Sequence, residues 1–253
     1  MHYLSVLAQF KNETYNLDIW LQHYIWQGVE HFYLIDNGST DNPLTILQPY
    51  IKKGLVTYYY KPQKYMQKEN YRIVFDKANL RYVTKWLIIC DLDEFFYGVD
   101  KKLSTKLKTL EMFNVLYANW LMFGTDGLIH HPKDIRTSIV HREYKLNENT
   151  KMIIQPRAFV SSQVSLHCIV NPITNARINA HPRLKITNKL IRLNHYPIQS
   201  KEFYDNVKTT RGDATASRLD NVRNAAYFVK GTKFCNYKDN TLKSLIENPP
   251  PNY

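Results

Sequence analysis

The sequence has few cysteines and no long apolar run. Its 253 residues contain only Cys90, Cys168 and Cys235, and this odd, widely spaced set excludes a disulfide framework and a cysteine-rich zinc site. The longest apolar runs, such as residues 86–90, are far shorter than the ~20 residues that a membrane helix needs. The first residues lack the basic and apolar pattern of a secretion signal. We therefore expect no transmembrane segment and a cytoplasmic location.

Acidic residues are scarce in the second part of the chain. Residues 1–100 carry ten Lys/Arg and eleven Asp/Glu, whereas residues 101–253 carry 24 and 11. Residues 151–200 carry seven basic residues and no acidic one. Such a basic region is either a solvated surface or binds an anionic partner, for which nucleic acid and a nucleoside diphosphate are candidates. The sequence lacks zinc-finger spacing, heptads and an RNA-binding signature, so no nucleic acid partner is expected.

Strand and helix patterns alternate in the first hundred residues. The apolar spacing predicts strands at residues 3–8, 31–35, 55–60 and 86–90. Helices are predicted between them, from an N-cap at Asn12 to Gly28, over residues 42–53 and over residues 67–84. Further strands are expected at residues 117–123, 139–144, 152–159 and 190–195. This pattern predicts an α/β fold in which parallel βαβ units lead into a mixed sheet.

Polar residues follow three of these strands, at the edge of the sheet where ligands bind in such folds. The sharpest pair is Asp91 and Asp93, which follow a strand that is apolar on both faces. In an extended chain these two carboxylates point the same way, and Mg²⁺ or Mn²⁺ would relieve their repulsion. The alternative is a solvated turn or a helix cap, which is also the simplest interpretation of residues 12–13 and 36–41.

These motifs together resemble a known family. The matching segments are residues 11–13 (Lys-Asn-Glu), 36–41 (Asp-Asn-Gly-Ser-Thr-Asp), 91–96 (Asp-Leu-Asp-Glu-Phe-Phe), 120–127 (Trp-Leu-Met-Phe-Gly-Thr-Asp-Gly), 192–196 (Arg-Leu-Asn-His-Tyr), and Lys208 with Arg211 and Gly212. In this order they resemble the GT-A glycosyltransferases, and most closely family 92 and family 2-like enzymes. The similarity covers about residues 3–212 and is to the compact soluble type found in bacteria and large DNA viruses.

The resemblance implies a single GT-A domain, with a Rossmann-like nucleotide-binding half and a mixed central sheet flanked by helices. Residues 1–100 would bind the nucleotide sugar, residues 101–212 would form the acceptor side, and residues 213–253 would form a C-terminal lid or helical tail. The implied activity is metal-dependent transfer of a hexosyl or pentosyl group from a nucleoside diphosphate sugar, with a UDP-sugar favoured. The implied acceptor is a hydroxyl of a glycan or glycoprotein, and inversion of the anomeric centre is favoured.

The resemblance also implies site residues. The metal, Mn²⁺ or Mg²⁺, would be held by Asp93, Asp91 and His195. The donor would be bound by Gln9, Asn12, Glu13, Asp36, Asn37, Arg72, Asp91, Arg157, Lys208 and Arg211. The basic members of this set suit a diphosphate, on which negative charge grows as the sugar departs.

An inverting reaction needs a carboxylate base for the acceptor hydroxyl. Asp126 is the first candidate, followed by Asp213 and Asp76. Glu94, Glu143 and Asp205 are further alternatives. We expect residues 211–224 to form a lid, with Gly212 as its hinge, that orders when the donor binds.

Two other functions remain open from the residues. A nucleotidyltransferase would share the α/β sheet and paired carboxylates, but it would usually show a glycine-rich basic loop that this sequence lacks. A non-catalytic module that binds nucleic acid or an anionic glycan would explain the basic half alone. Its binding would depend on salt and would ignore Mn²⁺.

Overall fold

The computed structural model describes residues 1–177, 183–186, 189–220, 222–251 and 253. The strands are β1 His2–Phe10, β2 His31–Asp36, β3 Val56–Tyr60, β4 Thr84–Ile89, β5 Glu94–Gly98, β6 Val115–Met122, β7 His141–Glu143, β8 Thr150–Ile154, β9 Arg183–Ile186, β10 Ile191–His195 and β11 Cys235–Lys238. The α-helices are α1 Leu17–Trp26, α2 Leu44–Lys52, α3 Gln67–Lys77, α4 Leu80–Val83, α5 Leu103–Lys108, α6 Ile135–Ser138, α7 Lys201–Phe203, α8 Ala225–Lys233 and α9 Thr241–Glu247.

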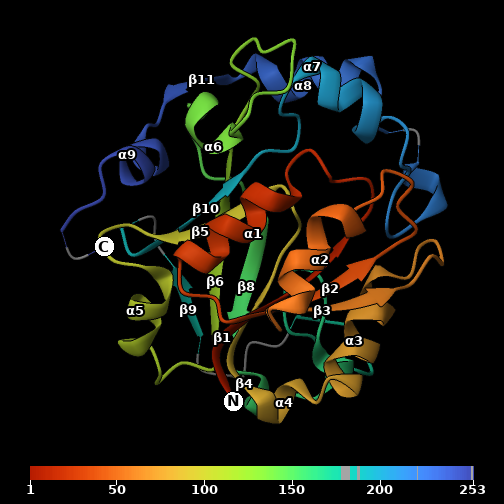
Figure 1. The fold of residues 1–253 in the computed structure, drawn as a ribbon, viewed down its shortest axis with the longest axis vertical. Helices are drawn as coiled ribbons and strands as arrows, with labels where there is room; N and C mark the ends of the chain where they lie inside the picture. Colours follow the sequence, from red (N-terminus) through yellow and green to blue (C-terminus); the bar gives the residue numbers. More distant parts are fainter. Residues whose placement is uncertain (178–182, 187–188, 221, 252) are drawn as a thin grey trace.

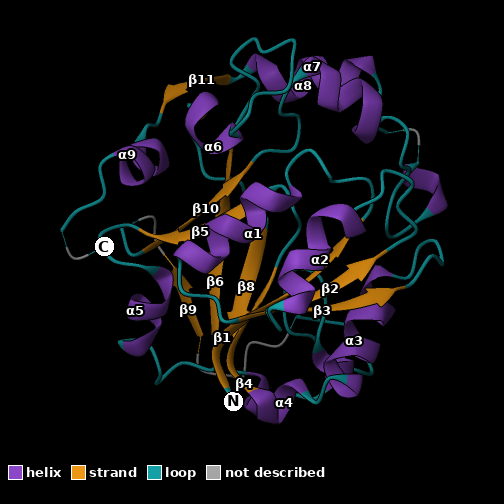
Figure 2. Ribbon diagram, viewed as in Figure 1, coloured by secondary structure: helices purple, strands orange, loops and turns teal. Residues whose placement is uncertain are grey.

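One mixed sheet organises the fold (Figure 2). Its order is β3-β2-β1-β4-β8-β6-β10-β5, and β9 pairs with β6. The first four strands in this order are parallel, β8 is antiparallel to both of its neighbours, and β10 is parallel to β6. The predicted α/β fold, with a parallel half leading into a mixed sheet, is therefore confirmed.

Helices cover both faces of the parallel half. Alternate residues of β1 belong to different apolar clusters, so that Val6 packs with residues of α1 and Leu7 packs with residues of α3. This two-residue period is what a strand buried on both faces requires. Among the described residues, no helix combines the length and apolar character that crossing a bilayer requires.

Three predicted elements differ from the structure. The N-cap at Asn12 is wrong, because α1 begins only at Leu17 and Asn12 has φ 54°. The helix predicted over residues 67–84 is broken at Asn79, which has φ 55° and separates α3 from α4. The strand predicted over residues 152–159 ends at Ile154, and a 3₁₀ turn begins at Pro156. Asparagine tolerates the left-handed region and proline removes a strand donor, which explains the two later breaks.

The segment after residue 200 closes over one end of the sheet. In Figure 1 the N-terminus lies at the bottom, whereas α7 and α8 lie at the top, beyond the carboxyl ends of the parallel strands. β11 pairs with β7, and α9 packs against α6, so this segment is joined to residues 135–143. The functional residues of the early strands and of this late segment therefore meet at the same edge.

Candidate active site

A cavity of about 320 Å³ lies at the carboxyl edge of the parallel strands. Its wall combines the residues that follow β1, β2 and β4 with the end of β10 and the segment 208–227. Nine of the residues singled out from the sequence line it: Gln9, Glu13, Asn37, Asp91, Asp93, His195, Lys208, Arg211 and Asp213. The fold therefore brings together groups that are up to 204 positions apart in the chain.

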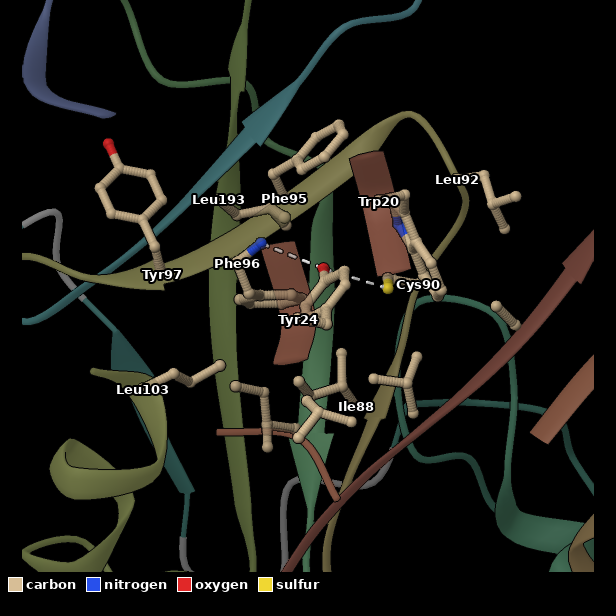
Figure 3. Close-up of a cluster of buried hydrophobic side chains, with 14 of the residues drawn as sticks. Trp20, Tyr24, Ile88, Cys90, Leu92, Phe95, Phe96, Tyr97, Leu103 and Leu193 are labelled. Carbon is tan, nitrogen blue, oxygen red and sulfur yellow. Dashed lines mark hydrogen bonds between the residues drawn. The ribbon is translucent and has the colours of Figure 1, made fainter. Parts of the chain in front are cut away.

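The Asp91–Asp93 segment is a turn held by the core, and not the extended segment that was expected. The Glu94 amide donates to the Asp91 carbonyl at 3.2 Å, and the Asp91 amide donates to a Glu94 carboxylate oxygen at 2.8 Å. The Trp20 indole N–H, from α1, donates to the carbonyls of Asp91 and Glu94, each at 3.2 Å. Figure 3 shows Trp20 beside Tyr24, whose hydroxyl accepts from the Phe96 amide at 3.1 Å. The core thus fixes the backbone that carries both carboxylates.

The turn sends the two carboxylates to different partners. Asp91 accepts from Lys151 Nζ at 2.8 Å and from Gln67 Nε2 at 3.0 Å. Burial alone would raise the pKa of Asp91, but the Lys151 charge outweighs it and lowers that pKa. Burial likewise opposes the charge of Lys151, yet Asp91 and Glu94 raise its pKa well above the usual value. Asp91 and Lys151 therefore form an ion pair at neutral pH, in which Lys151 is buried and Asp91 is 35% exposed.

Asp93 faces the late segment of the chain. Its Oδ2 accepts from Lys208 Nζ at 2.5 Å, and its Oδ1 lies 3.5 Å from His195 Nε2. Burial would raise the pKa of Asp93, but Lys208 and His195 hold it well below the usual range. His195 ends β10, opposite Glu94 in the antiparallel register with β5, and its ring packs on Trp120 with centroids 4.3 Å apart. The sheet register therefore sets the distance between the histidine and this turn.

Glu13 and Arg211 form a third buried ion pair at the cavity. Burial raises the pKa of Glu13, and the charges of Arg211 and Lys208 oppose that rise only in part. The Glu13 Oε2 atom has no hydrogen-bond partner among the described residues, and neither does Gln9 Nε2. Gln9 accepts from Asn70 Nδ2 at 2.8 Å through its other side-chain atom. These spare polar atoms are available to a ligand.

Other donor-site candidates shape the surrounding loops. Asp36 accepts from the Ser39 amide at 2.7 Å and from the Tyr58 hydroxyl at 2.7 Å. Asn12 accepts from the Thr40 amide at 2.8 Å, which ties the loop after β1 to the loop after β2. These contacts of Asp36 and Asn12 stabilise a turn and hold two loops together. Asn37, which lines the cavity, donates to the carbonyls of Lys61 and Gln63.

Two arginine candidates have their contacts outside the cavity. Arg72 donates to the carbonyls of Ser162 and Val164 at 2.6 and 3.1 Å, and so holds the segment after β8. Arg157 is exposed in the 3₁₀ turn Pro156–Ala158.

The three leading base candidates are separated by the fold. Asp213 lines the cavity, although one of its oxygens accepts from the Thr215 amide and hydroxyl. Asp126 has φ 50° and accepts from the amides of Val140 and His141, at the edge of a second hollow. Asp76 accepts from the Ser161 hydroxyl at 2.6 Å. Of these three carboxylates, only Asp213 lies beside Asp93 in the wall of the same cavity.

The cavity residues Gln67, Arg223 and Tyr227 were missed from the sequence, and so was Lys151, the partner of the cavity residue Asp91. Lys151 stands in the strand Thr-Lys-Met-Ile-Ile, all of whose residues are buried. A lysine in such a strand needs a carboxylate partner, and this signal could have identified it. Gln67, Arg223 and Tyr227 had no comparable signal, because polar residues on exposed-looking segments are common.

The donor set suits a divalent ion of the Mn²⁺ or Mg²⁺ type. Asp93, Glu94 and His195 each offer one ligand atom, and these atoms lie within 4.8 Å of one another. Glu94 Oε1 and His195 Nδ1 have no partner among the described residues. Two carboxylates with one imidazole fit Mn²⁺ well. This set shares Asp93 and His195 with the predicted one and contains Glu94 where Asp91 was expected.

Comparisons with known proteins identify the family of the chain. The model of glycosyltransferase family 92 matches residues 3–225. A family 92 protein of Ricinus communis is 24% identical over 220 residues, which are 82% of this chain. The chain spans only 38% of that relative's length.

Solved structures resemble the chain more distantly. S. aureus TarS, residues 1–349, is 14% identical over 90% of this chain and 71% of that chain, with a TM-score of 0.48. GalNAc-T7, crystallised with UDP, GalNAc and Mn²⁺, is 13% identical over 98% of this chain and 56% of that chain, with a TM-score of 0.49. The family match covers most of the chain and includes every segment that builds the cavity wall up to residue 225. The chain therefore belongs to glycosyltransferase family 92.

Proposed function

We propose that this chain transfers a sugar from a nucleoside diphosphate sugar, with a UDP-sugar favoured, to a hydroxyl of a glycan or glycoprotein. The reaction is metal-dependent and inverts the anomeric centre. The observation that carries the proposal is the cavity, where ligands for a divalent ion and cations for a diphosphate line the same space. Family membership supports the reaction class.

The donor is held by both ends of the chain. The spare Nε2 of Gln9, together with Glu13 and Asn37, would contact the base and ribose, because these groups face the cavity from the ends of β1 and β2. Lys208 and Arg211 would contact the diphosphate, on which negative charge develops in the transition state. Arg72 and Arg157 have their contacts elsewhere and are not part of this proposal.

The metal would be held by Asp93 with Glu94 and His195, while Asp91 would face the ribose from its pair with Lys151. When bound, the ion supplies charge neutralisation for the departing diphosphate. Asp213 is the proposed base, because it lies in the cavity wall on the segment that follows Arg211.

The first test is calorimetry of UDP, GDP, TDP and CDP with Mn²⁺ and with EDTA. We expect one nucleotide, most simply UDP, to bind at micromolar concentration with Mn²⁺ and much more weakly with EDTA. If no nucleotide binds with the ion present, the proposal fails. Salt-sensitive binding of polyanions that ignores Mn²⁺ would then support the module that binds anionic polymers.

The base is tested by comparing Asp213→Asn, Asp126→Asn and Asp76→Asn once the donor is known. Loss of general-base catalysis typically lowers the rate by 10²–10⁴-fold. We expect that loss in kcat for Asp213→Asn, with unchanged donor affinity. The other two variants should keep kcat within a few-fold. A large fall in kcat for Asp126→Asn alone would move the base to that residue.

A further inference from the structure

The buried ammonium group of Lys208 is bound to Asp93, the carboxylate that is best placed to hold the metal. Lys208 Nζ lies 2.5 Å from Asp93 Oδ2, and the two side chains are only 4% and 7% exposed. The other Asp93 oxygen faces His195. In this state both oxygens of the carboxylate are engaged by the chain's own groups.

The local backbone is built to place this lysine. Residues Tyr204–Lys208 form a π-helical turn directly after α7, and such wide turns are rare and often occur at functional sites. The turn directs Lys208 into the cavity, and Arg211 follows in the same wall. The Lys208 ammonium also lies over the Phe203 ring, 5.7 Å from its centre.

Three carboxylates of the cavity wall each have a cation of the chain as partner, and Lys151 also lies 3.4 Å from Glu94. Asp91 is paired with Lys151, Glu13 with Arg211, and Asp93 with Lys208. A divalent ion that reaches Asp93 meets the ammonium of Lys208 at close range, and at low dielectric such repulsion is strong. A diphosphate in the same cavity offers that ammonium a new anionic partner. The flexible stem of lysine makes this exchange of partners possible.

We propose, on the basis of the function proposed above, that Lys208 is the resident counter-cation of Asp93 and that the divalent ion must displace it. The diphosphate of the donor accepts the displaced ammonium. The ion and the nucleotide therefore bind cooperatively, and each binds more weakly alone. By linkage, the factor by which the nucleotide improves metal affinity equals the factor by which the metal improves nucleotide affinity.

The first experiment uses Mn²⁺ alone, measured by calorimetry or electron paramagnetic resonance on the nucleotide-free protein. We expect Lys208→Met to bind Mn²⁺ about tenfold more tightly than the wild type, within the 5–150-fold range of typical couplings. Lys208→Arg keeps the positive charge and should bind Mn²⁺ as weakly as the wild type. Lys201→Met is the matched control, because Lys201 forms an exposed ion pair with Asp205. It should leave Mn²⁺ affinity unchanged.

The second experiment measures UDP affinity with Mn²⁺ and with EDTA. In the wild type we expect Mn²⁺ to improve UDP binding by about a hundredfold, and in Lys208→Met we expect that factor to fall to about tenfold. Thermal unfolding identifies the folded variants. Lys208→Gln, which retains an N–H donor for Asp93, replaces Lys208→Met if the latter does not fold.

The outcomes separate this inference from the proposed function. Equal or weaker Mn²⁺ binding in the neutral variants overturns the displacement of Lys208, even if UDP still binds with Mn²⁺. If the wild type binds no nucleotide, the proposed function fails, and the diphosphate's part in the exchange fails with it. Tighter Mn²⁺ binding in Lys208→Met would still establish that Lys208 and the ion compete for Asp93.

Discussion

Two buried clusters of charged residues can be compared in the part of the chain that the structure describes, and one of them lines the cavity. In the first, Asp239 joins β11 to the sheet through Arg142 of β7 and Arg192 of β10. In the second, Asp93 and its neighbours line the cavity at the end of the parallel strands. Both clusters bury carboxylates against cations, so buried charge alone does not distinguish a binding site from a structural link.

The difference lies in the carboxylate oxygens, since the atom left unpaired in the Asp239 cluster is a donor, Arg192 Nε. Asp239 accepts from Arg142 and Arg192 through Oδ2 and from the Thr241 hydroxyl, at 2.7 Å, through Oδ1. In the second cluster, Glu13 Oε2 belongs to the cavity wall and has no partner among the described residues, and neither has Glu94 Oε1, on the buried residue that follows Asp93. Asp239, whose two oxygens are both satisfied and which is outside the wall of the cavity, stabilises the fold. Spare atoms that face a cavity can bind a ligand.

The largest expected effect is the loss of stability from Asp239→Asn. The substitution leaves two buried guanidinium groups with much of their charge uncompensated, which typically costs about 3–5 kcal/mol. Chemical denaturation should show this loss, while the folded variant should bind UDP and Mn²⁺ as the wild type does. Asp100→Asn is the control, because Asp100 pairs with Lys106 on the surface and is 60% exposed. Its cost should stay within about 1 kcal/mol.

Suppose that Asp239→Asn binds nucleotide more weakly at a temperature where it is folded. The distinction between the two clusters would then be wrong. Such a result would mean that the Asp239 cluster acts on the site through β10, which carries both Arg192 and His195.

The matched substitution in the cavity is Asp93→Asn, and unlike Asp239→Asn it should weaken the binding of Mn²⁺ and UDP. The amide keeps the shape of the carboxylate but loses the charge that the metal requires. We expect Mn²⁺-dependent UDP affinity to fall at least about a hundredfold, which corresponds to about 2.7 kcal/mol. Calorimetry with Mn²⁺ measures this change, and thermal unfolding identifies the temperature range in which the variant is folded, because the substitution also leaves the buried Lys208 ammonium without its partner.

Asp100→Asn again serves as the control, because it removes one carboxylate that is not part of the cavity wall. Unchanged UDP binding in Asp93→Asn would show that the cavity does not use this carboxylate. In that case the contrast between the two clusters would have to be explained without a metal.

The sequence predicted the scaffold well because its signals are local. Apolar strands that alternate with helices define the parallel half, and in such a sheet the ends of β1, β2 and β4 must share one edge. The local pattern alone therefore places Glu13, Asp91 and Asp93 together. The positions of His195, Lys208 and Arg211 depended on motif resemblance, because nothing local connects residues 192–212 with β4.

The details of the site depended on contacts that no local pattern contains. The turn at residues 91–94 is stabilised by Trp20, which lies more than 70 positions earlier in the chain. Asp126 and Arg72 have the residue types of a base and a phosphate ligand, but each is engaged by backbone groups of a neighbouring loop. A residue's chemistry can be read from the sequence, whereas the direction of its side chain depends on the completed tertiary structure.

The smallest expected effect is a pH dependence of the folding stability that arises from the Asp239 cluster. Burial alone would raise the pKa of Asp239, but Arg192, Arg142 and Thr241 lower it to about 2, against about 3.9 in an unfolded chain. Because the folded pKa is the lower one, the stabilisation is complete above about pH 4 and is lost as the pH falls toward 2. Partial solvent screening limits it to about 1–2 kcal/mol.

Urea denaturation measures this pH-dependent stabilisation when the wild type and Asp239→Asn are compared at pH values between 2 and 6. Asp91 and Asp93 also have lowered pKa values, so both proteins should lose stability in acid. The difference between them isolates Asp239, and it should shrink by about 1–2 kcal/mol between pH 5 and pH 2. A difference that stays constant with pH would show that the Asp239 carboxylate contributes through its hydrogen bonds and not through its charge. The two clusters would then differ in the kind of interaction that holds them, as well as in the space beside them.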